Sequence, residues 1–92
     1  MDEQHIEKVK LLLTEWNPLG QRASQIVDLE NYETEAIDIL FYINKKSSTN
    51  YINKIMVDVL SQAFGLDLKL AITIKYAERI REIINIKQNT MA

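Results

Sequence analysis

The chain has 92 residues, of which 47% are hydrophobic and 26% charged, so it can build one hydrophobic core and is not disordered by composition. It contains no cysteine, which excludes disulfides, thiolate metal sites and cysteine nucleophiles. Its net charge of -2 argues against a general nucleic-acid binder, because such proteins carry a surplus of basic residues. We therefore expect a single domain over residues 1–92.

Two features of the sequence bear on location. Residues 1–5 are polar and acidic, whereas a secretory signal is basic and then apolar. The longest unbroken apolar run, residues 39–43, is far shorter than the roughly 20 residues that a membrane-spanning helix needs. Both features predict a cytoplasmic protein that does not enter a membrane.

Residues 2–16 are predicted to form the first helix, because apolar side chains recur there at spacings of three and four and share one face. These side chains are Ile6, Val9, Leu12, Leu13 and Trp16. Pro18 ends the helix, since proline disfavours helical geometry at the preceding Asn17 and has no N–H of its own. Gly20 can adopt the positive φ of a turn. Residues 20–31 show no clean period, and we expect an ordered connection with a short helical turn.

The second helix is predicted over residues 32–46, with Asn31 as its N-cap and Glu33 and Glu35 in its first turn. Lys45 and Lys46 are placed in its last turn, the end of the helix dipole that favours cations. Its buried face is predicted to consist of Tyr32, Ala36, Ile39, Leu40 and Ile43.

Residues 47–50 form a polar break with several N-cap candidates, and a third helix is predicted over residues 50–64. Gly65 follows at the position that glycine prefers after a helix end. A fourth helix is predicted over residues 69–87. The side chains predicted to face inward are Ile52, Ile55, Met56, Val59, Ala63 and Phe64 on the third helix, and Leu70, Ile74, Ala77, Ile80, Ile83 and Ile84 on the fourth.

A strand is the alternative for residues 68–74, which are rich in β-branched and apolar residues. No other segment offers a strand partner, and a lone strand leaves its backbone groups unsatisfied. The helical interpretation is favoured. The predicted fold class is all-α, a single-domain bundle of four main helices over about 2–16, 32–46, 50–64 and 69–87.

The sequence offers few residues for catalysis. His5 is the single histidine, it lies in the first turn of the first predicted helix, and we interpret it as an exposed polar residue. No second histidine and no cysteine is present to complete a metal site, and the spacing of an EF-hand is absent. Gly20 and Gly65 cannot together make a loop that cradles phosphate. We expect a protein that is not an enzyme and has neither catalytic residues, cofactor nor metal.

The charge distribution has one uneven feature, an acidic block. Residues 23–44 contain no lysine or arginine but five acids, Asp28, Glu30, Glu33, Glu35 and Asp38. Acids in a first helical turn stabilise the helix by about 0.3–1 kcal/mol each without any partner, so a structural interpretation is as good as a functional one. The functional hypothesis is that the five acids form a negative surface for a basic protein, with Glu35 and Asp38 on one helical face.

Short motifs carry a resemblance to a known family, and they are Trp16-Asn17-Pro18-Leu19-Gly20 and Tyr32-Glu33-Thr34-Glu35-Ala36. The chain resembles small bacterial all-helical proteins marked by a Trp-[Asp/Asn]-Pro-x-Gly turn after the first helix and a Tyr-Glu-x-Glu helix start. A later match is Tyr76-Ala77-Glu78-Arg79-Ile80, so the resemblance covers most of the chain. The chain departs from the pattern in its longer connection, residues 21–31.

Some proteins of this kind are similar to immunity proteins of contact-dependent growth inhibition and other polymorphic toxin systems, whose toxic domains are often RNases. The resemblance implies a cytoplasmic inhibitor that binds a cognate toxin, a basic nuclease domain, and masks its active site or its RNA-binding surface. A nuclease must present lysines and arginines to RNA phosphates, which suits an acidic partner. The inhibitor would be a monomer or weak dimer that binds neither nucleic acid nor membrane directly.

Two other classes of function stay open. In a helix-turn-helix regulator, residues 69–81 would supply the DNA-contacting helix, although Glu78 and Glu82 interrupt its basic face. A self-associating adaptor would use apolar side chains left over from the helical stripes, such as Leu11, Ile37 and Phe41. A gel shift with random DNA tests the first class, and light scattering of the purified protein tests the second.

Overall fold

The first helix begins and ends where local groups satisfy its terminal backbone. In the computed structural model, which describes residues 2–26 and 29–85, helix α1 spans Glu3–Trp16. The Asp2 side chain caps it by accepting a hydrogen bond from the Gln4 N–H at 2.8 Å. At the other end Asn17 adopts left-handed geometry (φ 51°) and donates its N–H to the Leu13 carbonyl at 2.7 Å. The helix therefore stops immediately before Pro18, as predicted.

Two short 3₁₀ turns, η1 (Gly20–Gln25) and η2 (Glu30–Tyr32), make up much of the connection that follows, in keeping with the expected helical turn. Asn31 is not the N-cap that the sequence predicts: it has φ 57°, and the N-cap position is taken by Tyr32, whose side chain makes no capping hydrogen bond. Glu30, Asn31 and Tyr32 are all left-handed, a conformation that costs a non-glycine residue roughly 1–2 kcal/mol. We attribute this turn to the burial of the Tyr32 side chain, which offsets the cost.

Tyr32 joins the connection to the end of α1. Its side chain is 2% exposed, and its hydroxyl donates to Asn17 Oδ1 at 2.6 Å and accepts from the Leu19 N–H at 3.3 Å. Its ring packs edge to face against Phe64, with 6.1 Å between ring centroids. Burial raises the pKa of the Tyr32 hydroxyl, and the charge of Glu35 raises it further against the lowering effect of the Leu19 N–H. We call Asn17, Leu19 and Tyr32 the Tyr32 hub.

Helix α2 spans Glu33–Phe41 and ends at Phe41 rather than at residue 46. Lys45 and Lys46 therefore lie beyond the helix, and their predicted place in its last turn is wrong. Local hydrogen bonds explain the early end: Ser47 Oγ accepts from the Asn44 N–H at 2.9 Å, and Asn44 Oδ1 accepts from the Lys46 N–H at 2.8 Å. Such bonds from short polar side chains offer the backbone an alternative to the helix.

Helices α3 (Thr49–Phe64) and α4 (Leu70–Asn85) lie close to their predicted ranges. Ser48 caps α3 by accepting from the Tyr51 N–H at 3.1 Å, and Gly65 ends it with φ 67°, as predicted. Residues 70–74 are helical, so the strand alternative is wrong for them. The predicted end of the fourth helix near residue 87 lies outside the described residues.

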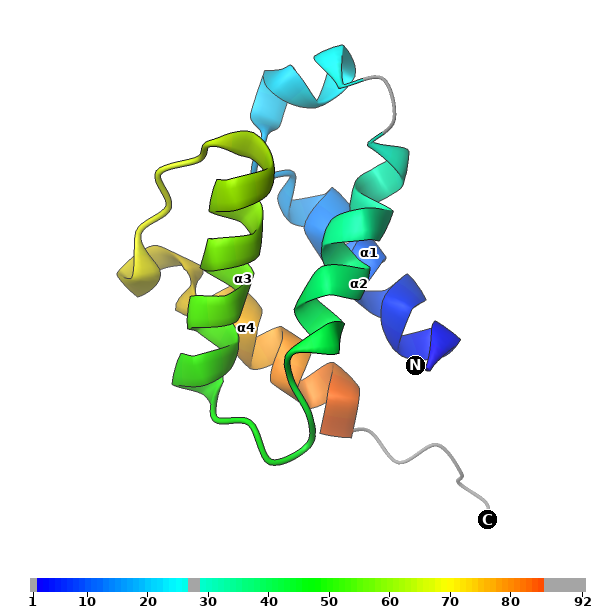
Figure 1. Cartoon of the computed structure of the whole chain (residues 1–92), viewed down its shortest axis with the longest axis vertical. Coiled ribbons are helices and arrows are strands. Elements are labelled where there is room, and N and C mark those ends of the chain that lie inside the picture. The colour runs from blue at the N-terminus through cyan, green and yellow to red at the C-terminus, as the bar shows by residue number, and fades with distance from the viewer. Residues whose placement is uncertain (1, 27–28, 86–92) are drawn as a thin grey trace.

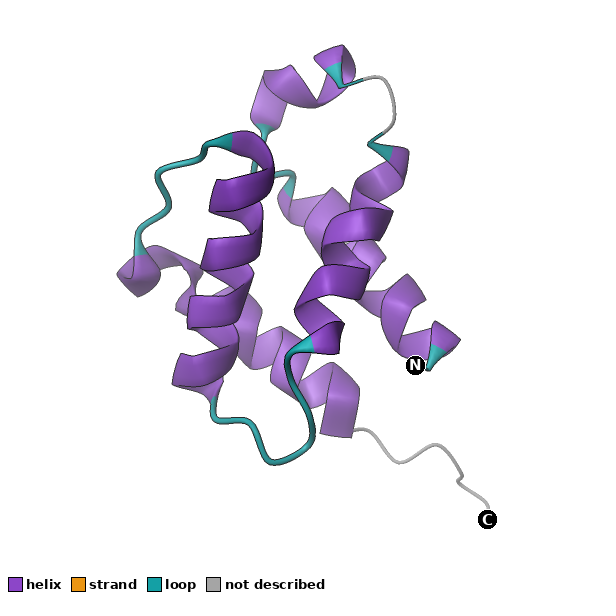
Figure 2. Cartoon of the chain, viewed as in Figure 1, coloured by secondary structure: helices purple, strands orange, loops and turns teal. Residues whose placement is uncertain are grey.

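Each helix packs against two others. α1 packs against α2 and α4, and α3 packs against the same two helices; in Figure 1, α2 and α3 lie in front of α1 and α4. The described residues contain no strand (Figure 2), so the fold is the predicted all-α bundle of four main helices. Within the described part of the chain, no helix is long and apolar enough to cross a membrane.

The buried apolar side chains form one core at the centre of this bundle. Its members are Val9, Leu12, Leu13, Leu19, Tyr32, Ala36, Ile39, Leu40, Ile43, Ile52, Met56, Leu60, Ala77, Ile80 and Ile84. Most were predicted to face inward, but Leu19 and Leu60 were not. Leu70 was predicted inward and is 52% exposed, because Thr73 and Ala77 take the inward positions at the start of α4. Ala63 was also predicted inward and is exposed.

A hydrogen-bonded polar pair lies in the interface between α3 and α4. Thr73 Oγ1 donates to Asn53 Oδ1 at 2.6 Å, and both residues are buried. Asn53 Nδ2 donates in turn to the Leu70 carbonyl at 3.0 Å. Because a buried polar group is costly unless it is hydrogen-bonded, this pair favours one register of α3 against α4.

An aromatic stack joins the first and last described helices. The rings of Trp16 and Tyr76 lie 4.1 Å apart between centroids with an interplanar angle of 13°. Arg79 and Glu15 add an exposed ion pair at 3.6 Å, which contributes little. The tryptophan that marks the end of α1 is therefore used to hold α1 against α4.

Candidate functional site

The structure distributes the acidic block over several environments. Asp28 lies outside the described residues. Glu30 is exposed on the left-handed turn, and Asp38 is exposed on α2. The two exposed acids are available to a partner.

Glu33 and Glu35 are engaged within the fold. Glu33 Oε1 accepts a hydrogen bond from Lys10 Nζ on α1 at 3.0 Å, and this bond is the main cause of the raised pKa of Lys10. Glu35 is 8% exposed, on the buried side of α2. Glu35 therefore does not share an exposed face with Asp38, because α2 packs against both α1 and α3 and turns that part of its surface inward.

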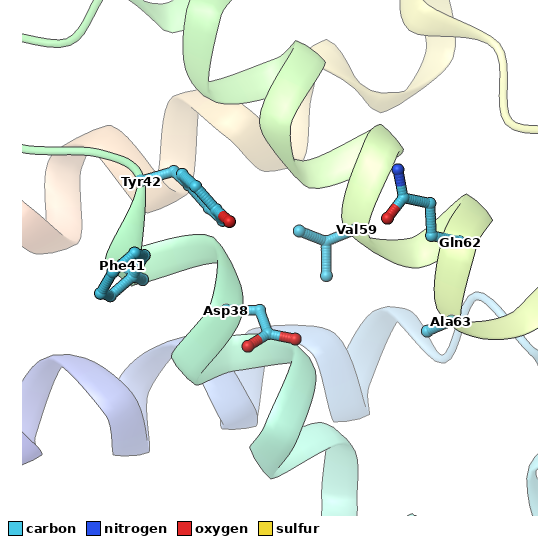
Figure 3. Close-up of a pocket in the computed structure, with 6 residues that line it drawn as sticks. All are labelled: Asp38, Phe41, Tyr42, Val59, Gln62 and Ala63. Atoms are coloured by element: carbon cyan, nitrogen blue, oxygen red, sulfur yellow. The ribbon is translucent and has the colours of Figure 1, made fainter.

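Asp38 stands at the edge of a groove between α2 and α3. The groove has a volume of about 500 Å³ and is lined by Asp38, Phe41, Tyr42, Val59, Gln62 and Ala63. Figure 3 shows the residues of α2 and its C-terminal end on one side and those of α3 on the other. Ala63 has a short side chain, which leaves the groove open at this turn of α3.

A second hollow of about 180 Å³ adjoins the first and shares Tyr42, Val59 and Gln62 with it. Its other lining residues are Ile55 and Asp58. Each hollow thus has one carboxylate, and none of the described residues that line either hollow is basic. We call the two hollows together the α2–α3 groove.

Two large aromatic side chains stand exposed at this groove. Phe41 is 71% exposed and Tyr42 57%, and their rings pack edge to face with 5.1 Å between centroids. Exposed aromatics that adjoin a groove are typical of protein interfaces, where tyrosine, phenylalanine and arginine are enriched. The α2–α3 groove therefore has the composition of a docking site for a protein.

Sequence reasoning found only part of this site. It identified Asp38 as an acid and Phe41 as an apolar residue left over from the helical stripe. It missed Tyr42 and Asp58, which lie outside any motif. The signal for Tyr42 was its place directly after Phe41, between the buried Leu40 and Ile43 but outside their apolar stripe.

The polar groups of the groove are two carboxylates, a hydroxyl and an amide on an open surface. No family model, curated protein or solved structure matches the chain. The groove presents carboxylates that can pair with a positive charge. It also presents apolar and aromatic surface against which the stem of a side chain can pack.

Proposed function

We propose that this protein is a cytoplasmic immunity protein that binds a cognate bacterial toxin domain, an RNase, and neutralises it by masking its basic surface. The observation that carries the proposal is the α2–α3 groove, which combines exposed Phe41 and Tyr42 with the carboxylates of Asp38 and Asp58. The resemblance of the two sequence motifs to immunity proteins points in the same direction.

Charge complementarity supports an RNase as the partner. An RNase must gather lysines and arginines around the RNA phosphates, and these cations are exposed when RNA is absent. Carboxylates facing them speed the encounter and select the partner by its charge. Glu30 and Asp38 are the exposed described members of the acidic block, and Asp58 on α3 is a further exposed acid at the groove; these three support the proposal.

Affinity would come mainly from the aromatic side chains. A few buried residues carry most of the binding energy of an interface, and tyrosine and arginine are prominent among them. Phe41 and Tyr42 are already exposed in the free protein, so they need no rearrangement before they are buried by a partner. Binding at the basic surface would block the toxin by excluding RNA, without any chemical step.

Co-expression with the candidate toxin from the neighbouring gene tests the proposal. Cells that make the toxin should grow only when this protein is present, and the purified pair should form a complex. The double variant Asp38→Lys, Asp58→Lys should weaken the complex by at least tenfold and make it less salt-sensitive, because attraction becomes repulsion. Glu82→Lys, an exposed acid on α4 that does not line the groove, is the matched control and should bind normally.

Two results of this experiment would contradict the proposed function or the proposed contact. If the protein protects cells from no toxin encoded beside it, the immunity function is wrong. If the groove variants and the Glu82→Lys control bind equally well, the toxin is held elsewhere and the groove is not the contact.

A further inference from the structure

We propose that the α2–α3 groove receives an arginine side chain of the partner, with its guanidinium at Asp38 or Asp58 and its plane against the ring of Tyr42. This inference rests on the proposed function in that the partner is a basic protein. It is more specific, because it distinguishes arginine from lysine and names the residues that make the distinction.

The polar groups of the groove match a guanidinium. Figure 3 shows the Asp38 carboxylate, the Tyr42 hydroxyl and the Gln62 amide directed toward the space between α2 and α3. A guanidinium has five N–H donors in a planar fork and can bind a carboxylate with two parallel hydrogen bonds. Acceptors on both helices can therefore be satisfied by one side chain.

The apolar walls favour arginine over lysine. A guanidinium is weakly hydrated and stacks on aromatic faces, whereas an ammonium is a compact and strongly hydrated charge that loses more on leaving water. The exposed ring of Tyr42 belongs to both hollows, so it is within reach of a guanidinium at either carboxylate. Val59 lines both hollows, and the methylenes of an arginine stem can pack against it.

Other classes of ligand fit less well. A phosphate or a nucleic acid would meet two carboxylates and no basic lining residue among those described. A purely apolar side chain would cover Asp38 and Asp58 without satisfying them, which costs free energy. A cation with an apolar stem satisfies both the walls and the charges.

The inference can be tested with a small probe and the full-length protein. The probe is N-acetyl-arginine amide, titrated to millimolar concentrations into the ¹⁵N-labelled protein, with N-acetyl-lysine amide and N-acetyl-leucine amide in parallel. We expect chemical-shift changes at Asp38, Tyr42, Val59 and Gln62 with the arginine probe, and binding weaker by about threefold or more with the lysine probe. Equal binding of arginine and lysine, or shifts spread over the other exposed acids, would overturn the inference.

Variants separate the parts of the arginine site. Asp38→Asn and Asp58→Asn together should weaken binding of the arginine probe by roughly threefold to tenfold, since they remove its ionic partners. Tyr42→Leu should abolish the preference for arginine over lysine, whereas Tyr42→Phe should retain it, because the ring is kept. Glu82→Gln, at an exposed acid of α4 that does not line the groove, should leave binding unchanged.

The outcomes distinguish this inference from the proposed function. Arginine binding in the groove together with toxin protection that survives Asp38→Lys, Asp58→Lys supports the arginine site and counts against its use for the toxin. Protection that depends on Asp38 and Asp58 without any preference for the arginine probe supports the proposed function and overturns the arginine site.

Discussion

Two tyrosines at opposite ends of α2 are used in opposite ways. Tyr32 is 2% exposed, and its hydroxyl and ring make contacts with Asn17, Leu19 and Phe64. Tyr42 is 57% exposed and packs edge to face against the more exposed Phe41 at the α2–α3 groove. The same residue type serves the fold at one end of the helix and is available for binding at the other.

The comparison teaches that a conspicuous motif need not be the functional one. The turn that contains Asn17 and the helix start that contains Tyr32 are far apart in sequence, yet the Asn17 side chain accepts from the Tyr32 hydroxyl. Thr14 also donates to the Asn31 carbonyl at 3.3 Å. The two motifs are therefore one structural unit, whereas the candidate binding residues have no motif.

The largest expected effect tests this contrast directly. Tyr32→Ala should lower the free energy of unfolding by about 3–5 kcal/mol, because it removes a buried aromatic side chain and leaves a cavity. Tyr42→Ala should lower it by less than about 0.5 kcal/mol, because its ring is mostly exposed already. Urea unfolding followed by circular dichroism measures both, and similar losses in the two variants would refute the contrast.

A smaller loss is expected from the polar pair between α3 and α4. Thr73→Val should cost about 1–3 kcal/mol, because Asn53 Oδ1 loses its donor and stays buried. Thr34→Val, the same change at an exposed position of α2, should alter stability by no more than about 0.5 kcal/mol. If both changes have the same effect in urea unfolding, the pair does not stabilise the interface.

The burial of the Tyr32 hydroxyl should also affect the free energy of unfolding in alkaline solution. Burial raises the pKa of Tyr32 above its usual value of 10.0, so above that pH the unfolded chain releases the tyrosine proton before the folded chain does. The stabilisation is complete below that pH and is lost as the pH rises through the folded-state pKa. The raised pKa of Lys10 acts in the same direction above 10.5.

Tyr32→Phe should therefore make stability fall less steeply with pH in the alkaline range, even though the variant is less stable near neutral pH. Urea unfolding at a series of pH values from neutral to alkaline measures the difference. Thr34→Val, which removes no titratable group from an exposed position of α2, is the control and should leave the slope as it is in the parent protein. An unchanged slope in Tyr32→Phe would show that the buried hydroxyl titrates as in the unfolded chain.

The smallest effect is expected from the carboxylates of the groove. Asp38→Asn and Asp58→Asn should change the free energy of unfolding by no more than about 0.5 kcal/mol each, because both residues are exposed. The same variants are expected to weaken partner binding, and this combination distinguishes residues that bind from residues that hold the fold. A marked loss of stability would instead assign the two acids to the fold.

Periodicity predicted the four helices because each must bury one apolar stripe. It failed at both ends of α2, where local contacts decide: Asn44 and Ser47 end the helix early, and the buried Tyr32 displaces Asn31 from the N-cap. It also misplaced the start of the stripe on α4, where the polar Thr73 faces inward and Leu70 outward. The spacing of apolar residues cannot predict that the Thr73 hydroxyl is buried, because its hydrogen-bond partner, Asn53, lies on another helix.

The candidate site was less predictable than the fold for a different reason. A groove depends on the distance and angle between two helices, which the sequence of either one does not specify. Asp38 could be chosen because acids cluster around it, but Asp58 is an isolated acid on α3. Glu35 is not part of the exposed acidic surface that the sequence predicts. It lies four residues before the buried Ile39, on the same face of α2, and is itself buried.

The stack of Trp16 on Tyr76 gives the protein a natural optical reporter. The chain has one tryptophan, so its tryptophan fluorescence reports on a single site, the contact between α1 and α4. Trp16 does not line the α2–α3 groove, so its emission should change when the helices separate and stay constant when the groove is filled. Unfolding can then be followed by intrinsic fluorescence even while a ligand occupies the groove, without a dye or a label.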